Sequence, residues 1–427
     1  MKIKNIDKAA ERIKQAVENK ERIILYGDSD LDGISSVVIL EEGIKNLGGE
    51  VCAVVFPNRE DDGYGINLKA LEFLREKAPA LFITLDLGIG NVKEVEIANK
   101  MGFEVIIVDH HQILDKIPDA KIIINPNQEG DNYSFKDLCN AGLTFKLAEE
   151  ILGDPISDNL RNSFLELVAL ATIADMVPQV DENKTFIEEG LRSLKNTFRP
   201  GLKAFLDILG IGEVLAGKFT KIISALNAAE STSFSAEGVS SPKANAPLEH
   251  ASGGKNESYE LLTSPSVQKC RELAEKLITK TQYKQQKIQE ITEEVERRIS
   301  SRLQDPDKVE DSRQSRNNRG SAIESGQNPN EAIIFEGDPA WKLLLAGPVA
   351  SIIASKYQKP TFIFKRGDEE SCGSVRSLKE GRNSVEAMKF CSDILITYGG
   401  HPKAAGFRIK TENLEKFRER LNDYFKK

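Results

Sequence analysis

The sequence lacks the features that mark membrane-spanning and disulfide-linked proteins. Nothing in its 427 residues approaches the roughly 18 continuous apolar residues that a membrane helix needs. The five cysteines are scattered and form no Cys-x-x-Cys pair, so neither a disulfide framework nor a zinc site is indicated. The first residues form an amphipathic helical pattern without the apolar core of a signal peptide. We therefore expect a cytoplasmic protein.

The chain also lacks an excess of positive charge. Its formal net charge is −8, which argues against attraction to nucleic acid over the whole surface. A local basic face is compatible with that balance, and basic residues outnumber acidic ones between residues 371 and 410. With 40% apolar and 29% charged residues, the composition is that of a globular protein large enough for two or three domains.

One short stretch, YGDSDLDG at residues 26–33, carries three aspartates at alternate positions after an apolar run. Asp28, Asp30 and Asp32 cannot all stay ionised in a dry site unless a cation neutralises them, and such oxygen ligands suit Mg²⁺, Mn²⁺ or Ca²⁺. An EF-hand loop is disfavoured, because its twelfth position needs a glutamate and Ile39 stands there. An Asp-nucleophile phosphatase using Asp30, a two-metal phosphoesterase and a solvated acidic turn all stay open at this point.

Strand and helix patterns alternate through residue 124 with short connections. Strands are expected at 23–25, 51–56, 81–85, 104–108 and 121–124, and helices at 34–47, 68–77 and 92–100. This alternation predicts a doubly wound, mostly parallel sheet, whose ligands bind at the carboxyl ends of the strands. Acidic residues follow three of these strands, at Asp28, Asp86 and Asp109. The convergence of three acidic strand ends predicts a metal site.

Two adjacent histidines follow the fourth strand. Because neighbours on extended backbone point to opposite sides, one imidazole of His110 and His111 is expected to bind metal while the other turns toward a bound phosphate. Asp109 is expected to orient the metal-binding histidine by accepting its second N–H. From residue 140 the chain is helical, and Asp175 ends an apolar helical face. An aspartate there is usually a helix-terminal residue, and a metal role follows only if a further acidic ligand is needed.

These motifs resemble, in the same order, the four motifs of the DHH phosphoesterase family. The matching stretches are YGDSDLDG, LDLG around Asp86, DHH at 109–111 and IADMV around Asp175. The ordered set speaks against the Asp-nucleophile phosphatase.

Within that family, three further segments are similar to RecJ-type single-strand exonucleases. They are PNREDDGYG at 57–65, GSVRS at 373–377 and GGHPKAAGF at 399–407. The chain departs from the RecJ pattern at Glu230, where an arginine is usual soon after an Asn-Ala-Ala element. The pattern resembles shorter archaeal RecJ-like nucleases at least as well as the bacterial proteins.

The resemblance implies two Mn²⁺ or Mg²⁺ ions and no protein nucleophile. In this expectation Asp86 bridges the ions, Asp32 supports the turn or the site, and His111 contacts the scissile phosphate beside Asp109. The candidate metal ligands are Asp28, Asp30, Asp32, Asp86, His110 and Asp175. The candidate substrate-binding residues are Arg59, Ser374, Arg376 and Ser377 for the terminal phosphate, and Gly399, Gly400 and His401 for the nucleotide near the metals.

The resemblance also implies an α/β fold in which a long helix joins a doubly wound DHH domain to a smaller α/β DHH-associated domain. We place the catalytic domain at 1–228 and the nucleic-acid-binding domain at 331–427. Residues 229–330 between them are expected to hold a mobile polar loop, one long helix from Tyr259 to Arg302 and a disordered insertion at 305–330.

The expected function is a metal-dependent phosphodiesterase of DNA repair and recombination that removes nucleotides from single-stranded DNA, 5′ to 3′. RNA is the other candidate substrate, and replication or repair proteins are the expected partners. Two alternatives stay open. One is a phosphodiesterase of the same superfamily acting on oligoribonucleotides or cyclic dinucleotides, and the other is an inactive replication scaffold.

Overall fold

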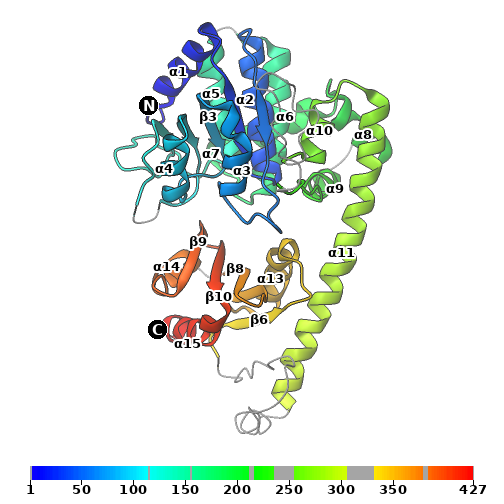
Figure 1. The fold of residues 1–427 in the computed structure, drawn as a ribbon. Coiled ribbons are helices and arrows are strands. Elements are labelled where there is room, and N and C mark those ends of the chain that lie inside the picture. Colours follow the sequence, from blue (N-terminus) through cyan, green and yellow to red (C-terminus); the bar gives the residue numbers. More distant parts are fainter. Residues whose placement is uncertain are drawn as a thin grey trace. The chain divides into compact units, whose positions relative to one another are not determined.

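The computed structural model describes residues 2–113, 116–153, 156–210, 216–234, 254–304, 331–377 and 383–426. It divides into an N-terminal unit, Met1–Thr281, and a C-terminal unit, Gln282–Lys427 (Figure 1). The domain limits expected at residues 228 and 331 stay predictions. Most of the expected mobile loop and the whole of the insertion at 305–330 lie outside the described residues.

A five-stranded parallel sheet forms the centre of the N-terminal unit. Its strands lie in the order β2-β1-β3-β4-β5. They are β1 (Ile23–Gly27), β2 (Ala53–Val55), β3 (Ala80–Leu85), β4 (Phe103–Val108) and β5 (Ile122–Ile124). Every residue of β1 and β3 is buried, which is typical of parallel strands covered on both faces. The doubly wound sheet expected from the sequence is confirmed.

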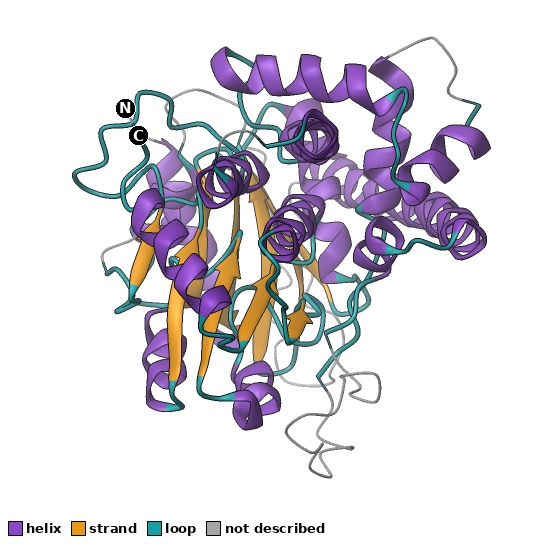
Figure 2. Cartoon of the chain, turned by 90° about the horizontal axis from the view of Figure 1, so that it is seen from above, coloured by secondary structure: helices purple, strands orange, loops and turns teal. Residues whose placement is uncertain are grey.

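Helices cover both faces of this sheet, as Figure 2 shows. Side chains such as Leu25 and Ile83 pack on one face against α1, α2, α5 and α6, and Ile24 and Phe82 pack on the other against α3 and α4. The bounds are α1 (Ile6–Glu18), α2 (Leu31–Asn46), α3 (Leu68–Leu74) with a 3₁₀ turn at Arg75–Lys77, α4 (Val92–Lys100), α5 (Asn140–Leu152) and α6 (Asp158–Ala174).

The rest of the N-terminal unit is helical. It contains α7 (Asp181–Leu194), α8 (Pro200–Ile208), α9 (Ala216–Leu226) and α10 (Glu257–Thr263). The expectation of one unbroken helix from Tyr259 to Arg302 is wrong, because α10 ends before Pro265 and α11 begins at Val267. Ser264 is extended, at φ −71° and ψ 130°, since a residue before proline avoids the helical conformation.

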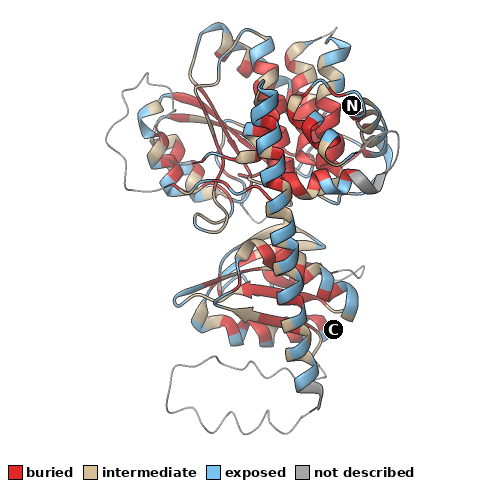
Figure 3. Cartoon of the chain, turned by 90° about the vertical axis from the view of Figure 1, so that its right-hand side faces the viewer, coloured by how far each residue is buried: buried red, intermediate tan, exposed pale blue. Residues whose placement is uncertain are grey.

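Helix α11 (Val267–Gln304) has 38 residues and crosses the boundary between the two units, so the expected long connecting helix exists. Between Leu277 and Ile291 it buries no side chain, and it is largely pale blue and tan in Figure 3. Side-chain hydrogen bonds within the helix, such as that from Gln286 to Glu290, stabilise this stretch. Among the described helices, none combines the length and the apolarity of a membrane span.

The C-terminal unit contains a second five-stranded sheet, in the order β6-β7-β8-β10-β9, with β6 and β7 parallel and the other pairs antiparallel. On one face Ile334 and Ile363 pack against α13, and on the other Phe362 packs against Phe417 of α15. The bounds are β6 (Ile334–Asp338), α13 (Leu343–Tyr357), β7 (Thr361–Lys365), β8 (Glu370–Arg376), α14 (Ser384–Lys389), β9 (Leu395–His401), β10 (Ala404–Lys410), a 3₁₀ turn at Thr411–Asn413 and α15 (Leu414–Lys426).

Candidate metal centre

The turn after β1 carries the three aspartates that the sequence singled out. Asp28 directly follows the strand, and Asp30 caps α2 by accepting a hydrogen bond from Gly33 N at 3.1 Å. Asp32 lies in the first turn of α2, so the three carboxylates do not all leave from one strand. Gly33 lies in that same helical turn, where a Cβ atom would stand 2.4 Å from the carbonyl oxygen of Asp28. Glycine is therefore required for the helix to begin this close to the strand.

Asp86 follows β3 and lies at the centre of the acidic group. Its Oδ1 is buried and stands 3.2 Å from His110 Nε2 and 3.9 Å from His111 Nδ1. Its backbone has φ 65°, a left-handed conformation that an L-residue seldom adopts. Burial and the charges of Asp32 and the neighbouring aspartates raise the pKa of Asp86 well above its ordinary value.

His110 presents an unprotonated nitrogen to a group of carboxylates. Its Nδ1 lies 2.9 Å from the carbonyl oxygen of Leu138, which can only accept, so the proton is on Nδ1. Its Nε2 faces Asp86 Oδ1 at 3.2 Å, and Asp32 Oδ2 and Asp175 Oδ2 at 3.7 Å each. Burial, and then the charge of His111, lower the pKa of His110 to about 4, so the ring stays neutral.

His111 pairs with Asp109, which corrects the expectation that Asp109 orients the metal-binding histidine. His111 Nδ1 lies 2.7 Å from Asp109 Oδ1, while the second nitrogen of His110 is engaged by Leu138 instead. Burial opposes protonation, but the Asp109 carboxylate prevails and raises the pKa of His111 to about 9. His111 is therefore a cation held beside the acidic group.

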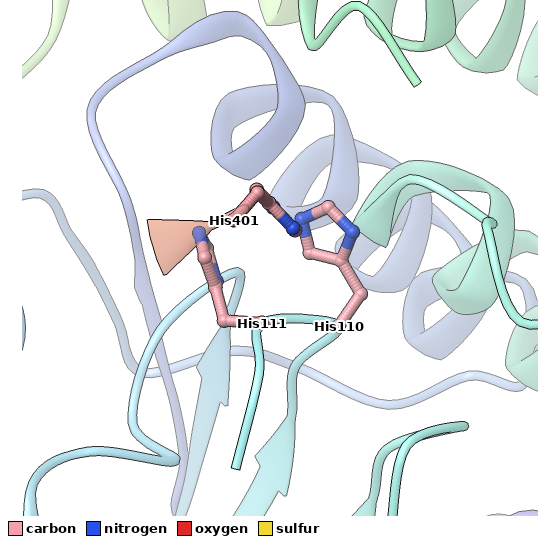
Figure 4. A group of neighbouring side chains, drawn as sticks. All are labelled: His110, His111 and His401. Carbon is pink, nitrogen blue, oxygen red and sulfur yellow. The ribbon is translucent and has the colours of Figure 1, made fainter. Parts of the chain in front are cut away.

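The two imidazoles do not point to opposite sides as expected. Figure 4 shows the rings of His110 and His111 on the loop that follows β4, and their centroids are 4.8 Å apart. Both rings approach the same oxygen, Asp86 Oδ1. The alternation rule fails here because β4 ends at Val108 and the chain bends at His111.

The carboxylates of Asp32 and Asp175 complete the group. Asp175 is the C-cap of α6, a helix-terminal residue as expected, and 20% of its side chain is exposed. Burial and the nearby carboxylates raise its pKa well above the ordinary value. Asp32 accepts hydrogen bonds from the main-chain N–H groups of Asn140 and Ala141, each at 2.7 Å. Burial and then the charge of Asp30 raise the pKa of Asp32 to about 7.

These side chains fit divalent cations. Three sets in the described part of this unit have ligand atoms within 4.8 Å of one another: Asp28/Asp30/Asp86, Asp32/His110/Asp175 and Asp86/Asp109/His111. Within the described residues, neither Asp86 Oδ1 nor Asp175 Oδ2 accepts a hydrogen bond. Buried carboxylate oxygens that converge with an imidazole nitrogen are the arrangement that a hard cation stabilises. Asp86 belongs to the first of these sets, and its Oδ1 lies 3.2 Å from His110 Nε2 of the second, so it is the residue suited to bridge two ions.

Arg59, expected at the terminal phosphate, contacts the acidic turn in this structure. Its Nε is 2.9 Å from Asp28 Oδ1 and its Nη2 is 2.9 Å from Asp30 Oδ2. The Tyr64 ring lies 5.6 Å from the guanidinium carbon, and the Tyr64 hydroxyl is 3.3 Å from the His111 ring. Arg59 thus partly neutralises the carboxylates at the place where the sequence predicts a metal ion.

The remaining predicted site residues belong to the C-terminal unit. Arg376 on β8 extends across α13, since a Cβ atom on Gly347 would stand 2.8 Å from Arg376 Nη2 and 3.6 Å from Ser374 Oγ. The structure therefore brings Ser374 and Arg376 together. Ser377 is only 1% exposed, so its hydroxyl is covered. The other predicted residues, Gly399, Gly400 and His401, lie on β9, separated from β8 by β10.

Sequence reasoning did not find several residues that shape the centre. The carbonyl oxygen of Leu138 sets the tautomer of His110, and a main-chain atom leaves no signal in a sequence. Tyr64 lies in the loop already noted for Arg59, so its place beside His111 could have been suspected. Asn227 Oδ1 accepts from Leu31 N at 2.9 Å and supports the start of α2.

Family models match most of both units. Residues 22–172 match the DHH family N-terminal domain, and residues 331–427 match the DHHA1 domain. The chain is 31% identical over 427 residues to the single-stranded-DNA-specific exonuclease RecJ of Bacillus subtilis, and 28% identical over 438 residues to that of Escherichia coli. It covers 48% and 69% of those proteins, respectively, and 99% of its own length is matched in each.

Solved structures show the same fold. A RecJ exonuclease bound to manganese aligns with a TM-score of 0.70 and 24% identity, covering all of this chain and 96% of that one. RecJ of Thermus thermophilus in complex with Mn²⁺ aligns with a TM-score of 0.72 and 24% identity, covering all of this chain and 55% of that one. The matches to the DHH and DHHA1 models and to RecJ relatives, with the ordered acidic strand ends, show that the chain is a RecJ-like member of the DHH family.

Proposed function

We propose that the protein is a metal-dependent phosphodiesterase that degrades single-stranded DNA from its 5′ end. The observation that carries this proposal is the neutral His110 nitrogen that faces three carboxylates, an arrangement of oxygen and imidazole ligands that a divalent cation stabilises. Family membership supports it, and so do the printed names of the relatives, which are single-stranded-DNA-specific exonucleases. Two of the structural neighbours were solved with Mn²⁺.

Two groups of side chains would hold two Mn²⁺ or Mg²⁺ ions. Asp28, Asp30 and Asp86 form one group, and Asp32, His110 and Asp175 form the other. Asp86 would be shared by both, since its Oδ1 lies 3.2 Å from His110 Nε2. When bound, a pair of such ions supplies an activated water and neutralises charge that grows on the phosphoryl oxygens. The carboxylates keep their places because β1, β3 and the start of α2 are fixed by the sheet and its helices.

His111 is the residue suited to contact the scissile phosphate. Asp109 holds its ring at 2.7 Å and is itself fixed by Ile89 N at 2.9 Å. A cationic imidazole in this position donates a hydrogen bond to a phosphoryl oxygen and favours the more negative transition state. Asp109 acts through His111 and is a positioning residue in this scheme.

The substrate end would be recognised by arginine and hydroxyl groups. The Arg376 guanidinium and the Ser374 hydroxyl lie together on β8, and a guanidinium fork matches a terminal phosphate. Arg59 is the further candidate, in the N-terminal unit, once its carboxylate partners are taken by metal. We assign Gly399, Gly400 and His401 to the nucleotide near the metals.

The test is digestion of single strands labelled at either end, with Mn²⁺, by the native protein and by Asp86→Asn. We expect short products to appear from the 5′ end with the native protein, and at least ~10³-fold less cleavage with Asp86→Asn, as for loss of a shared metal ligand. Equal cleavage by both proteins would falsify the metal assignment. Release of nucleotides from the 3′ end first would contradict the polarity.

The small-substrate alternative is separated by chain length. A phosphodiesterase of cyclic dinucleotides or oligoribonucleotides would lose activity as the strand lengthens, whereas the proposed exonuclease keeps degrading long strands. An inactive scaffold would show no Mn²⁺-stimulated cleavage of any strand.

A further inference from the structure

The side chain of Asn140, the first residue of α5, lies at the point where β3 and β4 end. It is fully buried. Its Oδ1 accepts a hydrogen bond from Asp86 N at 2.8 Å, and its Nδ2 donates to Val108 O at 3.0 Å. Asp86 N and Val108 O also form a ladder hydrogen bond with each other, at 3.0 Å. The Asn140 amide therefore forms hydrogen bonds with both the donor and the acceptor of the main-chain hydrogen bond that ends the pairing of β3 with β4.

The residue that this amide holds, Asp86, has a left-handed backbone conformation. Asp86 has φ 65°, and Gly88, two residues on, has φ 117°. An L-residue stays in such a conformation only where its surroundings fix it. The hydrogen bond from Asp86 N to Asn140 Oδ1 supplies such a restraint, and the direction of the Asp86 carboxylate follows from this backbone conformation.

Asn140 is itself fixed by two contacts with α2. Its main-chain N–H donates to Asp32 Oδ2 at 2.7 Å. The hydroxyl of Ser36, which lies 2.8 Å from Asp32 O, approaches the Asn140 side chain at 3.0 Å. The buried Asn140 amide thus lies where four elements meet. These are the starts of α2 and α5 and the ends of β3 and β4.

We propose that Asn140 is a positioning residue that sets the metal-binding geometry of Asp86. The inference rests on the proposed function, since Asp86 is the ligand that two candidate sets share. Asparagine suits the place because one side chain must accept from Asp86 N and donate to Val108 O at the same time. Alanine offers neither group, leucine fills the space without either, and aspartate retains the acceptor.

The test measures Mn²⁺ binding by titration calorimetry with the full chain, without substrate. We compare the native protein with Asn140→Ala, Asn140→Leu and Asn140→Asp. Loss of a residue behind a metal ligand typically weakens metal binding by about 10- to 100-fold, which is the effect expected for the alanine and leucine variants. The aspartate variant, which retains the acceptor toward Asp86 N, should bind Mn²⁺ more tightly than either. If the alanine variant does not fold, the leucine variant of similar volume takes its place.

The matched control is Asn422→Ala. Asn422 is a buried asparagine of the C-terminal unit that also accepts from a main-chain group, Ala332 N, at 2.9 Å. Its loss should lower the melting temperature without changing Mn²⁺ affinity. The inference is overturned if the alanine and leucine variants of Asn140 melt earlier but bind Mn²⁺ as tightly as the native protein. Failure of the native protein to bind Mn²⁺ would instead reject the proposed function.

Discussion

The guanidinium of Arg59 lies against the carboxylate of Asp28, with Nε 2.9 Å from Oδ1, and it reaches Asp30 as well. Without metal, one arginine therefore supplies positive charge to two of the candidate ligands. A cation that binds Asp28 and Asp30 must compete with that arginine.

We expect Arg59→Gln to bind Mn²⁺ more tightly than the native protein, because the competing guanidinium is gone. A gain of about tenfold corresponds to roughly 1.4 kcal/mol, a modest share of a close charge pair. Calorimetric titration with Mn²⁺ measures it. Arg12→Gln is the control, since Arg12 also pairs with two carboxylates, Glu21 and Glu104, outside the metal centre. Unchanged affinity in Arg59→Gln would show that the pair does not oppose metal binding.

The metal-free protein should lose stability as the pH rises from about 6 to 9. The folded pKa of Asp32 is about 7, above its ordinary 3.8, and that of His111 is about 9, above 6.5. In both cases the folded state holds a proton that the unfolded state releases at lower pH, so stability is lost as each folded pKa is passed. Thermal melts with a chelator should show a fall of several degrees.

Added Mn²⁺ should reverse this trend, because the ion replaces the protons and binds better as they leave. Asp32→Asn should flatten the melting profile between about pH 4 and 7, where only the folded carboxyl still holds its proton. A melting temperature that rises with pH in the presence of chelator is the contrary result.

Asp109→Asn should lower kcat through His111. The neutral amide no longer holds the imidazole as a cation, so we expect a loss of roughly 10- to 100-fold in kcat, within the range for a general acid or an oxyanion donor. The double variant with His111→Gln should be no slower than His111→Gln alone, which a double-mutant cycle tests. Independent, multiplying losses would mean that Asp109 acts by another route, such as its hydrogen bond from Ile89 N.

Arg376→Ala should weaken the preference for strands that carry a 5′ phosphate. Losing one charge-assisted contact raises KM for phosphorylated strands by about 10-fold and leaves unphosphorylated strands almost unchanged. Arg408→Ala is the control from the same sheet, because Arg408 on β10 pairs with Glu370 at the exposed surface. A similar rise in KM for both kinds of end would place Arg376 elsewhere in substrate binding.

Much of the N-terminal fold could be predicted because its signals are local. Buried apolar runs followed by acidic residues give the strands and the edge at which Asp28, Asp86 and Asp109 meet. The break before α11 also has a local signal, Pro265, which the sequence contains. The helical spacing of apolar residues on both sides of Pro265 nevertheless favours one continuous helix.

The contacts that could not be predicted connect distant segments. Arg59 reaches Asp28 across a loop, and Asn140 reaches Asp86 from a helix that begins 54 residues later, as the numbering in the sequence shows. Neither contact is indicated by the periodicity or the composition of the sequence. Asn140 reads only as the first polar residue of a helix, and which group its amide meets depends on how α5 packs on the sheet.

The stretch of α11 between Leu277 and Ile291, which buries no side chain, has a consequence for handling the protein. Lys280 contacts Glu257 and Thr281 contacts Ser224, but the stretch has no buried side chain. Its amides should therefore exchange with deuterium faster than those of the helix turns with buried side chains at either end. A protease such as trypsin should cut there first, at Lys284 or Lys287.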